Sequence, residues 1–235
     1  MPNSIPVITI DGPSGTGKGA VSGNLVQWLH WHFLDSGALY RVLALAAKYR
    51  GMGLEDTAAL AEIANHLDVE FTPPGPGKEV SVCLDGKCVD GELRTEACGN
   101  DASKIAAYPA VRAGLLSRQR QFRQAPGLIA DGRDMGTVVF PDATVKIFLT
   151  ASAQERAMRR YKQLKQKGFD VNLPQLSADI AERDARDSER TISPLKPADD
   201  AVVIDTTSID IRAVVEKVAS LVKQKIPQTA EIPMQ

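Results

Sequence analysis

Cysteine is scarce in this chain of 235 residues, which contains only Cys83, Cys88 and Cys98, all within one short region. A secreted domain stabilised by disulfides would carry more cysteines in a smaller chain. Cys83 and Cys88 could face each other across a hairpin, but we interpret both as reduced. The first six residues carry no basic side chain and lead directly into a strand pattern, unlike a signal peptide. We therefore expect a cytoplasmic protein.

An excess of charge of one sign is also lacking, because 28 Lys and Arg face 29 Asp and Glu. Dedicated nucleic-acid binders usually have a strong basic excess. Disordered chains combine a large net charge with low hydrophobicity, whereas 43% of these residues are apolar. No apolar run approaches the roughly 18 residues that a membrane-spanning helix needs, and the three histidines do not have the spacing of metal ligands. We expect a globular protein that binds neither nucleic acid nor membrane, and no direct protein ligand for a metal is assigned.

Short β-branched runs alternate with helical patterns along most of the chain. The strand candidates are residues 7–10, 127–130, 144–149 and 201–204. The helical candidates are residues 39–49, 54–67, 110–121, 153–167, 175–189 and 209–225. Strands that are separated by helical sequence predict an α/β fold with a central parallel sheet.

Residues 69–94 interrupt this alternation. Proline and glycine cluster at residues 73–77, and Asp85-Gly86 separates two short strand-like runs, which indicates a hairpin. We predict a small antiparallel β insertion here. The segment after Lys225 has two prolines and little that can pack, so we expect residues 226–235 to form a flexible tail.

A glycine-rich loop follows the first predicted strand. It reads Gly12-Pro13-Ser14-Gly15-Thr16-Gly17-Lys18-Gly19-Ala20 and precedes a helical stretch. The first seven residues match the loop in which backbone N–H groups and a lysine bind nucleotide phosphates. The usual Ser or Thr that holds Mg²⁺ after the lysine is replaced by Gly19, and Ala20 has no hydroxyl either. We expect nucleotide binding, with Mg²⁺ held through water and aspartates, although Ser22, Ser14 or impaired metal binding are alternatives.

Arginine is concentrated in one part of the chain. Between Arg112 and Arg190 there are 15 Lys and Arg against 10 Asp and Glu, so the neutral total conceals a cationic region. Arg133 directly follows an apolar strand pattern, and open α/β sheets bind their ligands at the carboxyl ends of strands. Arginine binds phosphate oxygens in pairs and keeps its charge. This distribution favours a pocket for anionic substrates.

Two helical patterns carry further cations. Arg183, Arg186 and Arg190 are spaced three and four residues apart and share one helical face, where surface ion pairs with the acids around them are the alternative to a site. Residues 156–167 carry six basic residues with no acid between them. Such a run is typical of a solvated face or of a hinged lid over a triphosphate.

Several segments resemble the bacterial cytidylate kinases. They are residues 10–19, 34–41, 93–95, 129–141 and 182–190, and Gly132-Arg133-Asp134-Met135-Gly136 is specific to that family. The similarity runs from about residue 7 to residue 225. It implies a P-loop three-layer fold and transfer of the γ-phosphoryl group of ATP, bound with Mg²⁺ as cofactor, to CMP or dCMP. We also expect a monomer, because no apolar surface stripe is left over once the core is assigned.

The resemblance also implies a division of the chain and a role for each matching residue. One kinase domain spans residues 1–225, with a core at about 5–68, 104–155 and 195–225, a monophosphate-binding insertion at 69–103 and a lid at 156–194. ATP should contact residues 12–20 of the glycine-rich loop, together with Arg156 and Arg160. CMP should contact Ser36, Tyr40, Arg41, Ser103, Arg112, Arg133, Asp134, Arg183, Asp187 and Arg190. The residues expected to be catalytic are Lys18, Arg133, Arg183 and Arg190.

Within the CMP site, Asp134, Arg112 and Ser103 should contact the cytosine edge. Arg41, Arg133 and Arg190 should contact the acceptor phosphate with Ser36 nearby, while Arg183 and Asp187 should face the sugar. Three alternatives stay open: a UMP/CMP kinase or other small-metabolite kinase, an NTPase associated with nucleic acid, and a homologue that binds nucleotides but catalyses weakly because of Ala20.

Overall fold

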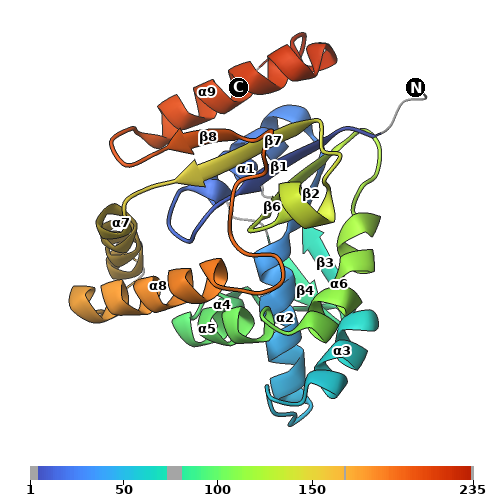
Figure 1. The fold of residues 1–235 in the computed structure, drawn as a ribbon, viewed down its shortest axis with the longest axis vertical. Coiled ribbons are helices and arrows are strands. Elements are labelled where there is room, and N and C mark those ends of the chain that lie inside the picture. Colours follow the sequence, from blue (N-terminus) through green and yellow to red (C-terminus); the bar gives the residue numbers. More distant parts are fainter. Residues whose placement is uncertain (1–4, 73–80, 167, 234–235) are drawn as a thin grey trace.

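The structure is a computed structural model that describes residues 5–72, 81–166 and 168–233. Its centre is a five-stranded sheet in the order β2-β6-β1-β7-β8, and every strand pairing in it is parallel (Figure 1). The strands are β1 (Val7–Asp11), β2 (His32–Asp35), β6 (Leu128–Gly132), β7 (Val145–Thr150) and β8 (Val202–Asp205). The predicted α/β fold with a central parallel sheet is confirmed.

Helices cover both faces of the sheet (Figure 1). On one face, α1 (Lys18–Leu29) and α9 (Ile211–Lys225) form a core with Ile8 of β1. On the other, α2 (Ser36–Tyr49) shares a core with Val7, and α3 (Thr57–Asn65) and α6 (Pro109–Gln121) extend that core. Because successive side chains of a strand point to opposite faces, neighbouring residues of β1 enter different cores. The three layers follow from this alternation.

The predicted antiparallel insertion is a three-stranded sheet of β3 (Val69–Thr72), β4 (Ser81–Leu84) and β5 (Lys87–Cys88). The proline-glycine cluster at residues 73–77 lies outside the described residues. After Cys88 the prediction of strands is wrong, because the chain forms α4 (Asp90–Leu93) and then α5 (Glu96–Ile105). The hydroxyl of Thr95 accepts a hydrogen bond from the backbone N–H of Cys98 at 3.2 Å and caps α5.

Two further helices extend from the sheet and lie side by side. They are α7 (Ala153–Gln166) and α8 (Leu173–Ser188), and they share a small apolar cluster of their own that includes Ala157 and Ile180. α8 also contacts α5, so this helical pair meets the insertion segment (Figure 1). No helix among the described residues is both long and apolar enough to cross a membrane.

Three features differ from the sequence-based expectations. The short strand β2 was not predicted, because its sequence begins with His32 and ends with Asp35 and has only two apolar residues. A π-helical turn at Met135–Val139 was not predicted either; the Asp11 carboxylate holds its first N–H groups by two hydrogen bonds of 2.8 Å. Neither feature has a local sequence signal.

The chain end is the third difference. Residues 226–233 pack against the body of the protein, whereas the prolines led us to expect a flexible tail from residue 226 onward. Ile226 and Thr229 are almost completely buried, and the indole N–H of Trp28 donates a hydrogen bond to the Ile232 carbonyl at 2.9 Å. Tertiary packing on α1 therefore orders this segment.

Candidate active site

The loop between β1 and α1 has the backbone of a phosphate site. A Cβ on Gly12 would lie 2.0 Å from the carbonyl oxygen of Leu149, so only glycine fits there. Gly17, which precedes α1, has a φ of 95° and gives the helix no side-chain cap. The first N–H groups of α1 therefore have no side-chain cap from Gly17 and, with the helix dipole, can attract an anion.

Lys18 is buried at the start of α1, and among the described residues no carboxylate forms an ion pair with it. Its ammonium instead donates a hydrogen bond to the Pro13 carbonyl at 2.8 Å. Burial and the nearby charge of Arg133 lower the pKa of Lys18 to about 7, while Asp131 opposes the shift. The site thus holds a cation that gains stabilisation from an anionic ligand.

Two aspartates lie at the carboxyl ends of the neighbouring strands β1 and β6: Asp11 is the last residue of β1, and Asp131 is the last but one of β6. Asp131 accepts a hydrogen bond from the hydroxyl of Ser22 at 3.3 Å, and burial raises its pKa to about 6. Burial also raises the pKa of Asp11 to about 7, although the backbone N–H groups of Met135 and Gly136 oppose that shift. Within the described ranges, no group of three or more His, Cys, Asp or Glu side chains is arranged to hold a metal ion.

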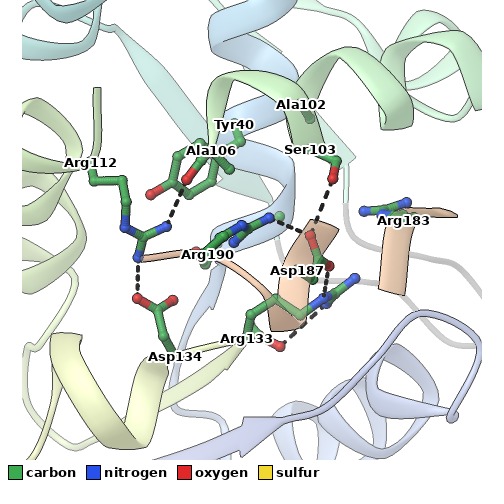
Figure 2. A pocket seen from close by; sticks show the side chains of 13 residues that line it. Tyr40, Ala102, Ser103, Ala106, Arg112, Arg133, Asp134, Arg183, Asp187 and Arg190 are labelled. Atoms are coloured by element: carbon green, nitrogen blue, oxygen red, sulfur yellow. Dashed lines mark hydrogen bonds and ion pairs between the residues drawn. The ribbon is translucent and has the colours of Figure 1, made fainter. Parts of the chain in front are cut away.

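A pocket opens at the carboxyl end of β6, where side chains of α2, α5, α6 and α8 converge (Figure 2). Its lining consists of Ser36, Gly37, Tyr40, Ala102, Ser103, Ala106, Arg112, Gly132, Arg133, Asp134, Arg183, Asp187 and Arg190. Every residue expected to contact CMP lines this pocket except Arg41. The guanidinium of Arg41 donates a hydrogen bond to the Leu93 carbonyl.

One side of the pocket contains a buried ion pair between Arg112 and Asp134 (Figure 2). Arg112 is 9% exposed, and it also donates to the Ala106 carbonyl at 3.2 Å. Burial raises the pKa of Asp134, although the Arg112 charge opposes the shift. The Tyr40 ring lies beside the guanidinium of Arg112, with 5.8 Å between its centroid and the guanidinium carbon, and its buried hydroxyl has no hydrogen-bond partner among the described residues. This side of the pocket therefore presents the Tyr40 hydroxyl, which could bind a ligand, next to the Arg112–Asp134 ion pair.

The other side is organised around Asp187. Figure 2 shows Asp187 between Ser103, Arg190 and Arg133. Ser103 donates to its carboxylate at 3.1 Å, Arg133 donates through Nε at 3.2 Å, and Arg190 forms an ion pair with it. Burial alone would raise the pKa of Asp187, but Arg133, Arg190 and Arg183 outweigh burial and lower it. Asp187 therefore stays ionised and fixes two arginines.

Ser36, at the start of α2, has a partner that the sequence did not suggest. The side-chain amide of Gln119 on α6 donates a hydrogen bond to the Ser36 hydroxyl at 2.8 Å. Both side chains are buried. A single glutamine in a helical pattern carries no motif, so Gln119 was missed.

A second pocket lies between the phosphate loop, α5, α7 and α8. It is lined by Ser14, Gly15, Glu96, Asn100, Arg160, Asp179, Ile180 and Arg183. Glu96, Asn100 and Asp179 were not predicted as site residues. Arg156 donates to the Ser14 carbonyl at 3.1 Å and pairs with Asp184, while Arg160 pairs with Glu96. The two lid arginines expected near ATP thus contact the loop or the pocket beside it.

Arg183 lines both pockets. Burial and the neighbouring Arg133 lower its pKa to about 9, so its guanidinium is still charged at neutral pH. Its buried Nε has no hydrogen-bond partner among the described residues. The positive charge of Arg183 thus lies between the phosphate loop and the polar pocket. This position suits transfer of an anionic group from one to the other.

The sequence is similar to those of known proteins along most of its length. Residues 8–224 match the family model described as cytidylate kinase. A cytidylate kinase of Shewanella denitrificans is 59% identical over 226 residues, which cover 96% of this chain and 100% of that protein. A cytidylate kinase of Aeromonas hydrophila is 58% identical over 226 residues, covering 96% and 97% of the two chains. The chain belongs to the cytidylate kinase family.

Proposed function

We propose that the protein transfers the γ-phosphoryl group of MgATP to CMP or dCMP, giving ADP and CDP or dCDP. One observation supports this most directly: Arg183 lines both the pocket beside the phosphate loop and the pocket that contains Asp134 and Asp187. A donor triphosphate and an acceptor monophosphate would meet at this arginine. Membership of the cytidylate kinase family supports the same reaction.

For the donor, we propose that the phosphates bind to residues 12–20, with the ammonium of Lys18 exchanging the Pro13 carbonyl for a phosphate oxygen. Mg²⁺ is part of this substrate. Ala20 is exposed and offers no ligand, and the hydroxyl of Ser22 is fully buried and bonded to Asp131. Asp131 is the carboxylate that acts electrostatically on Lys18 most strongly, so we assign it the role of holding Mg²⁺ through water.

For the acceptor, we propose that Asp134 accepts a hydrogen bond from the cytosine amino group, while Arg112 and Ser103 donate to the ring acceptors. Arg133 and Arg190, with Arg41 after it leaves the Leu93 carbonyl, neutralise the CMP phosphate. The sugar lies against Asp187 and Arg183. Arg112, Arg133 and Arg190 already form ion pairs in the pocket, so CMP would replace existing partners of these side chains and would not have to order them.

Catalysis in this scheme needs no general base, because the acceptor phosphate is already ionised near neutral pH. The protein aligns the two phosphates in line and neutralises the charge that spreads over the transferred group. Lys18, Arg133, Arg183 and Arg190 supply that positive charge.

We propose residues 156–194 as the lid and residues 69–103 as the monophosphate-binding insertion, with the remaining segments up to residue 225 forming the core. The α7–α8 pair has its own apolar cluster and can therefore move as a unit. Its Arg160 pairs with Glu96 of α5, which links lid and insertion. Closure of both over the substrates would exclude water as an acceptor.

The deciding experiment measures ADP release with CMP, dCMP, UMP, AMP and GMP as acceptors, with and without Mg²⁺. We expect CMP and dCMP to have the highest kcat/KM, because Asp134 can accept from an amino group that UMP lacks. Faster turnover with UMP or AMP would overturn the proposal. ATP hydrolysis that RNA or DNA stimulates, with no response to CMP, would identify a nucleic-acid-associated NTPase.

Substitution of Ala20 by threonine tests the magnesium assignment. If Asp131 already holds the ion through water, a new hydroxyl at this exposed position should change kcat and the Mg²⁺ concentration for half-maximal rate by less than about threefold. Asp131→Asn is the matched comparison and should raise that Mg²⁺ concentration by about tenfold or more. A large gain from Ala20→Thr would show that the missing hydroxyl limits the enzyme.

A further inference from the structure

The tip of the insertion hairpin brings two cysteines opposite each other. β4 and β5 are joined by Asp85 and Gly86, whose φ values of 47° and 73° are those of a two-residue type I′ turn. In the strand register, Cys83 lies opposite Cys88. The backbone N–H of Val89 donates to the Val82 carbonyl at 3.0 Å, while the Val82 N–H donates to the Asp90 carboxylate at 2.9 Å, so Val82 and Val89 occupy a hydrogen-bonded position of the ladder with one of its two bonds formed.

Antiparallel strands alternate hydrogen-bonded and non-hydrogen-bonded pairs. Cys83 and Cys88, one position nearer the turn, are therefore a non-hydrogen-bonded pair, in which the Cα atoms lie about 4.5 Å apart and the side chains are closest. A disulfide needs Cα atoms roughly 4.4–6.8 Å apart. The backbone of this hairpin already has the spacing that a cross-strand disulfide requires.

The two thiols lie on the accessible face of the hairpin. Val82 and Leu84 are buried in the core, so the alternation of the strand places Cys83 on the other face, half-buried, and Cys88 is exposed. The Cys88 sulfur lies 3.0 Å from the hydroxyl of Ser81 and 3.2 Å from the carboxylate of Asp90. A reagent in solution can reach Cys88 first and Cys83 through it.

We propose that Cys83 and Cys88 are a dithiol modification site that a small-molecule disulfide converts to a disulfide within the hairpin. The thiolate of Cys88 attacks one sulfur of the reagent, breaks its S–S bond and releases one thiolate, which leaves a mixed disulfide on Cys88. The thiolate of Cys83 then attacks the Cys88 sulfur, forms the Cys83–Cys88 bond and releases the second thiolate. Two cysteine thiols and one reagent disulfide become one protein disulfide and two reagent thiols, and the cysteine protons end on those thiols.

The surroundings of Cys83 affect the second step. Burial and the neighbouring carboxylates of Asp90 and Glu70 raise the pKa of Cys83. Because only the thiolate attacks, the attack of Cys83 on the mixed disulfide should accelerate as the pH rises. The mixed disulfide on Cys88 is then a transient species at alkaline pH.

The third cysteine provides an internal control. The Cys98 thiol lies on α5 and donates to the Arg41 carbonyl at 3.6 Å, and burial raises its pKa. Cleavage by trypsin after Lys87, Arg94 and Lys104 places each cysteine on a separate peptide. A disulfide can therefore be assigned from the pair of peptides that remain linked.

The experiment incubates the full chain with oxidised glutathione at alkaline pH and analyses the unreduced tryptic digest by mass spectrometry. We expect the Cys83 and Cys88 peptides to be linked, with two hydrogen atoms lost, and Cys98→Ser to behave like the unmodified chain. Cys83→Ser should stop at a stable glutathione adduct on Cys88. Linkage of either peptide to Cys98, or a stable glutathione adduct on Cys88 of the unmodified chain at every pH, would overturn the proposal, whatever the enzyme's activity toward CMP.

Discussion

The acceptor pocket and the phosphate loop handle positive charge in opposite ways. In the pocket, Arg112 pairs with Asp134, and Arg133 and Arg190 pair with Asp187, although all five side chains are mostly buried. At the loop, the only hydrogen-bond partner of the Lys18 ammonium among the described residues is the Pro13 carbonyl, and burial lowers the pKa of Lys18 to about 7. Ion pairs therefore hold most of the pocket's arginines before any substrate binds, whereas among the described residues no carboxylate pairs with Lys18.

This difference matches what each region has to recognise. Selection among nucleobases depends on donors and acceptors at fixed positions, and internal ion pairs hold them there at the cost of partner exchange on binding. A triphosphate needs chiefly positive charge and backbone N–H groups. Lys18, which has no ion-pair partner among the described residues, provides that charge. Its burial destabilises the protein as long as no anionic ligand is bound.

The largest expected effect is on turnover and comes from Lys18→Ala. Loss of the loop charge should lower kcat by about 10³-fold, since one preorganised charge or donor contributes about 10²–10³ to transition-state stabilisation. Denaturant unfolding should show no loss of stability, because the substitution removes a buried cation that the fold disfavours. Near-normal turnover would contradict the phosphate-loop assignment.

Lys146→Ala is the matched control for this substitution. That lysine pairs with Asp200 and donates to the Pro141 carbonyl, away from both pockets. We expect kcat to change by less than about twofold, because Lys146 lines neither pocket and so adds no charge to the phosphate sites.

In the acceptor pocket, Asp134→Ala should instead destabilise the fold. It leaves the buried guanidinium of Arg112 without its partner, which typically costs about 3–5 kcal/mol. It should also lower the preference for CMP over UMP by about 10²-fold, because the acceptor for the amino group is lost. Calorimetry and steady-state kinetics measure the two effects. Unchanged selectivity would refute the base contact.

A surface pair serves as the comparison for Asp134. Asp142 forms an ion pair with Arg123 and is 63% exposed. Asp142→Ala should lower the free energy of unfolding by less than about 1 kcal/mol and leave selectivity unchanged. Equal losses of folding free energy for Asp134→Ala and Asp142→Ala would show that the buried ion pair in the pocket stabilises the fold no more than an exposed one.

The contrast also explains which parts of the site the sequence could reveal. The phosphate loop is a continuous motif between a strand and a helix, so residues 12–18 could be recognised from their order alone. Arg112, Asp134 and Asp187 come from separate segments, and only the resemblance to a family suggested that they belong together. Their ion pairs join α6 and α8 to the segment that follows β6, a tertiary arrangement that local sequence does not report.

Other residues carry no signal that pattern reasoning can use. Gln119 contributes only one side-chain amide to a site formed by α2, and Glu96 looks like an ordinary acid at a helix start. The hydrophobic pattern of the sequence predicted the parallel sheet and most helices, but it did not predict β2 or the π-helical turn. Both are stabilised by partners distant in the sequence, which local periodicity does not report.

Nucleotide binding next to Lys18 should be coupled to proton uptake. With a pKa of about 7, Lys18 is mostly neutral above pH 7 in the empty protein, and bound phosphates favour its ammonium form. MgADP binding should therefore be accompanied by proton uptake at pH 8, whereas at pH 6 Lys18 is already protonated and should take up few protons. Affinity for MgADP should fall, with the Kd rising by up to about tenfold per pH unit above 7. Calorimetry in buffers of different ionisation enthalpy counts these protons.

Lys18→Arg separates the lysine from its neighbours, because a guanidinium stays protonated over this range. Asp11 and Asp131 have raised pKa values of about 7 and about 6, so any uptake that remains in the variant belongs to them. Binding of CMP, whose pocket does not include Lys18, should take up fewer protons. Equal uptake by the unmodified chain and Lys18→Arg would contradict the assignment to Lys18.

The smallest expected effect concerns the direction of one hydrogen bond in the acceptor pocket. Ser36 accepts from the amide of Gln119 at 2.8 Å, so its own hydroxyl proton is free for CMP. Gln119→Glu has the same shape, but a carboxylate only accepts. Ser36 must then donate to residue 119 and turn a lone pair toward the acceptor phosphate, beside a new negative charge. We expect the KM for CMP to rise by about tenfold, which corresponds to about 1.4 kcal/mol, with a smaller change in kcat. In a Ser36→Ala background the same substitution should cost less, and an equal cost with and without the serine would show that Gln119 acts independently of Ser36.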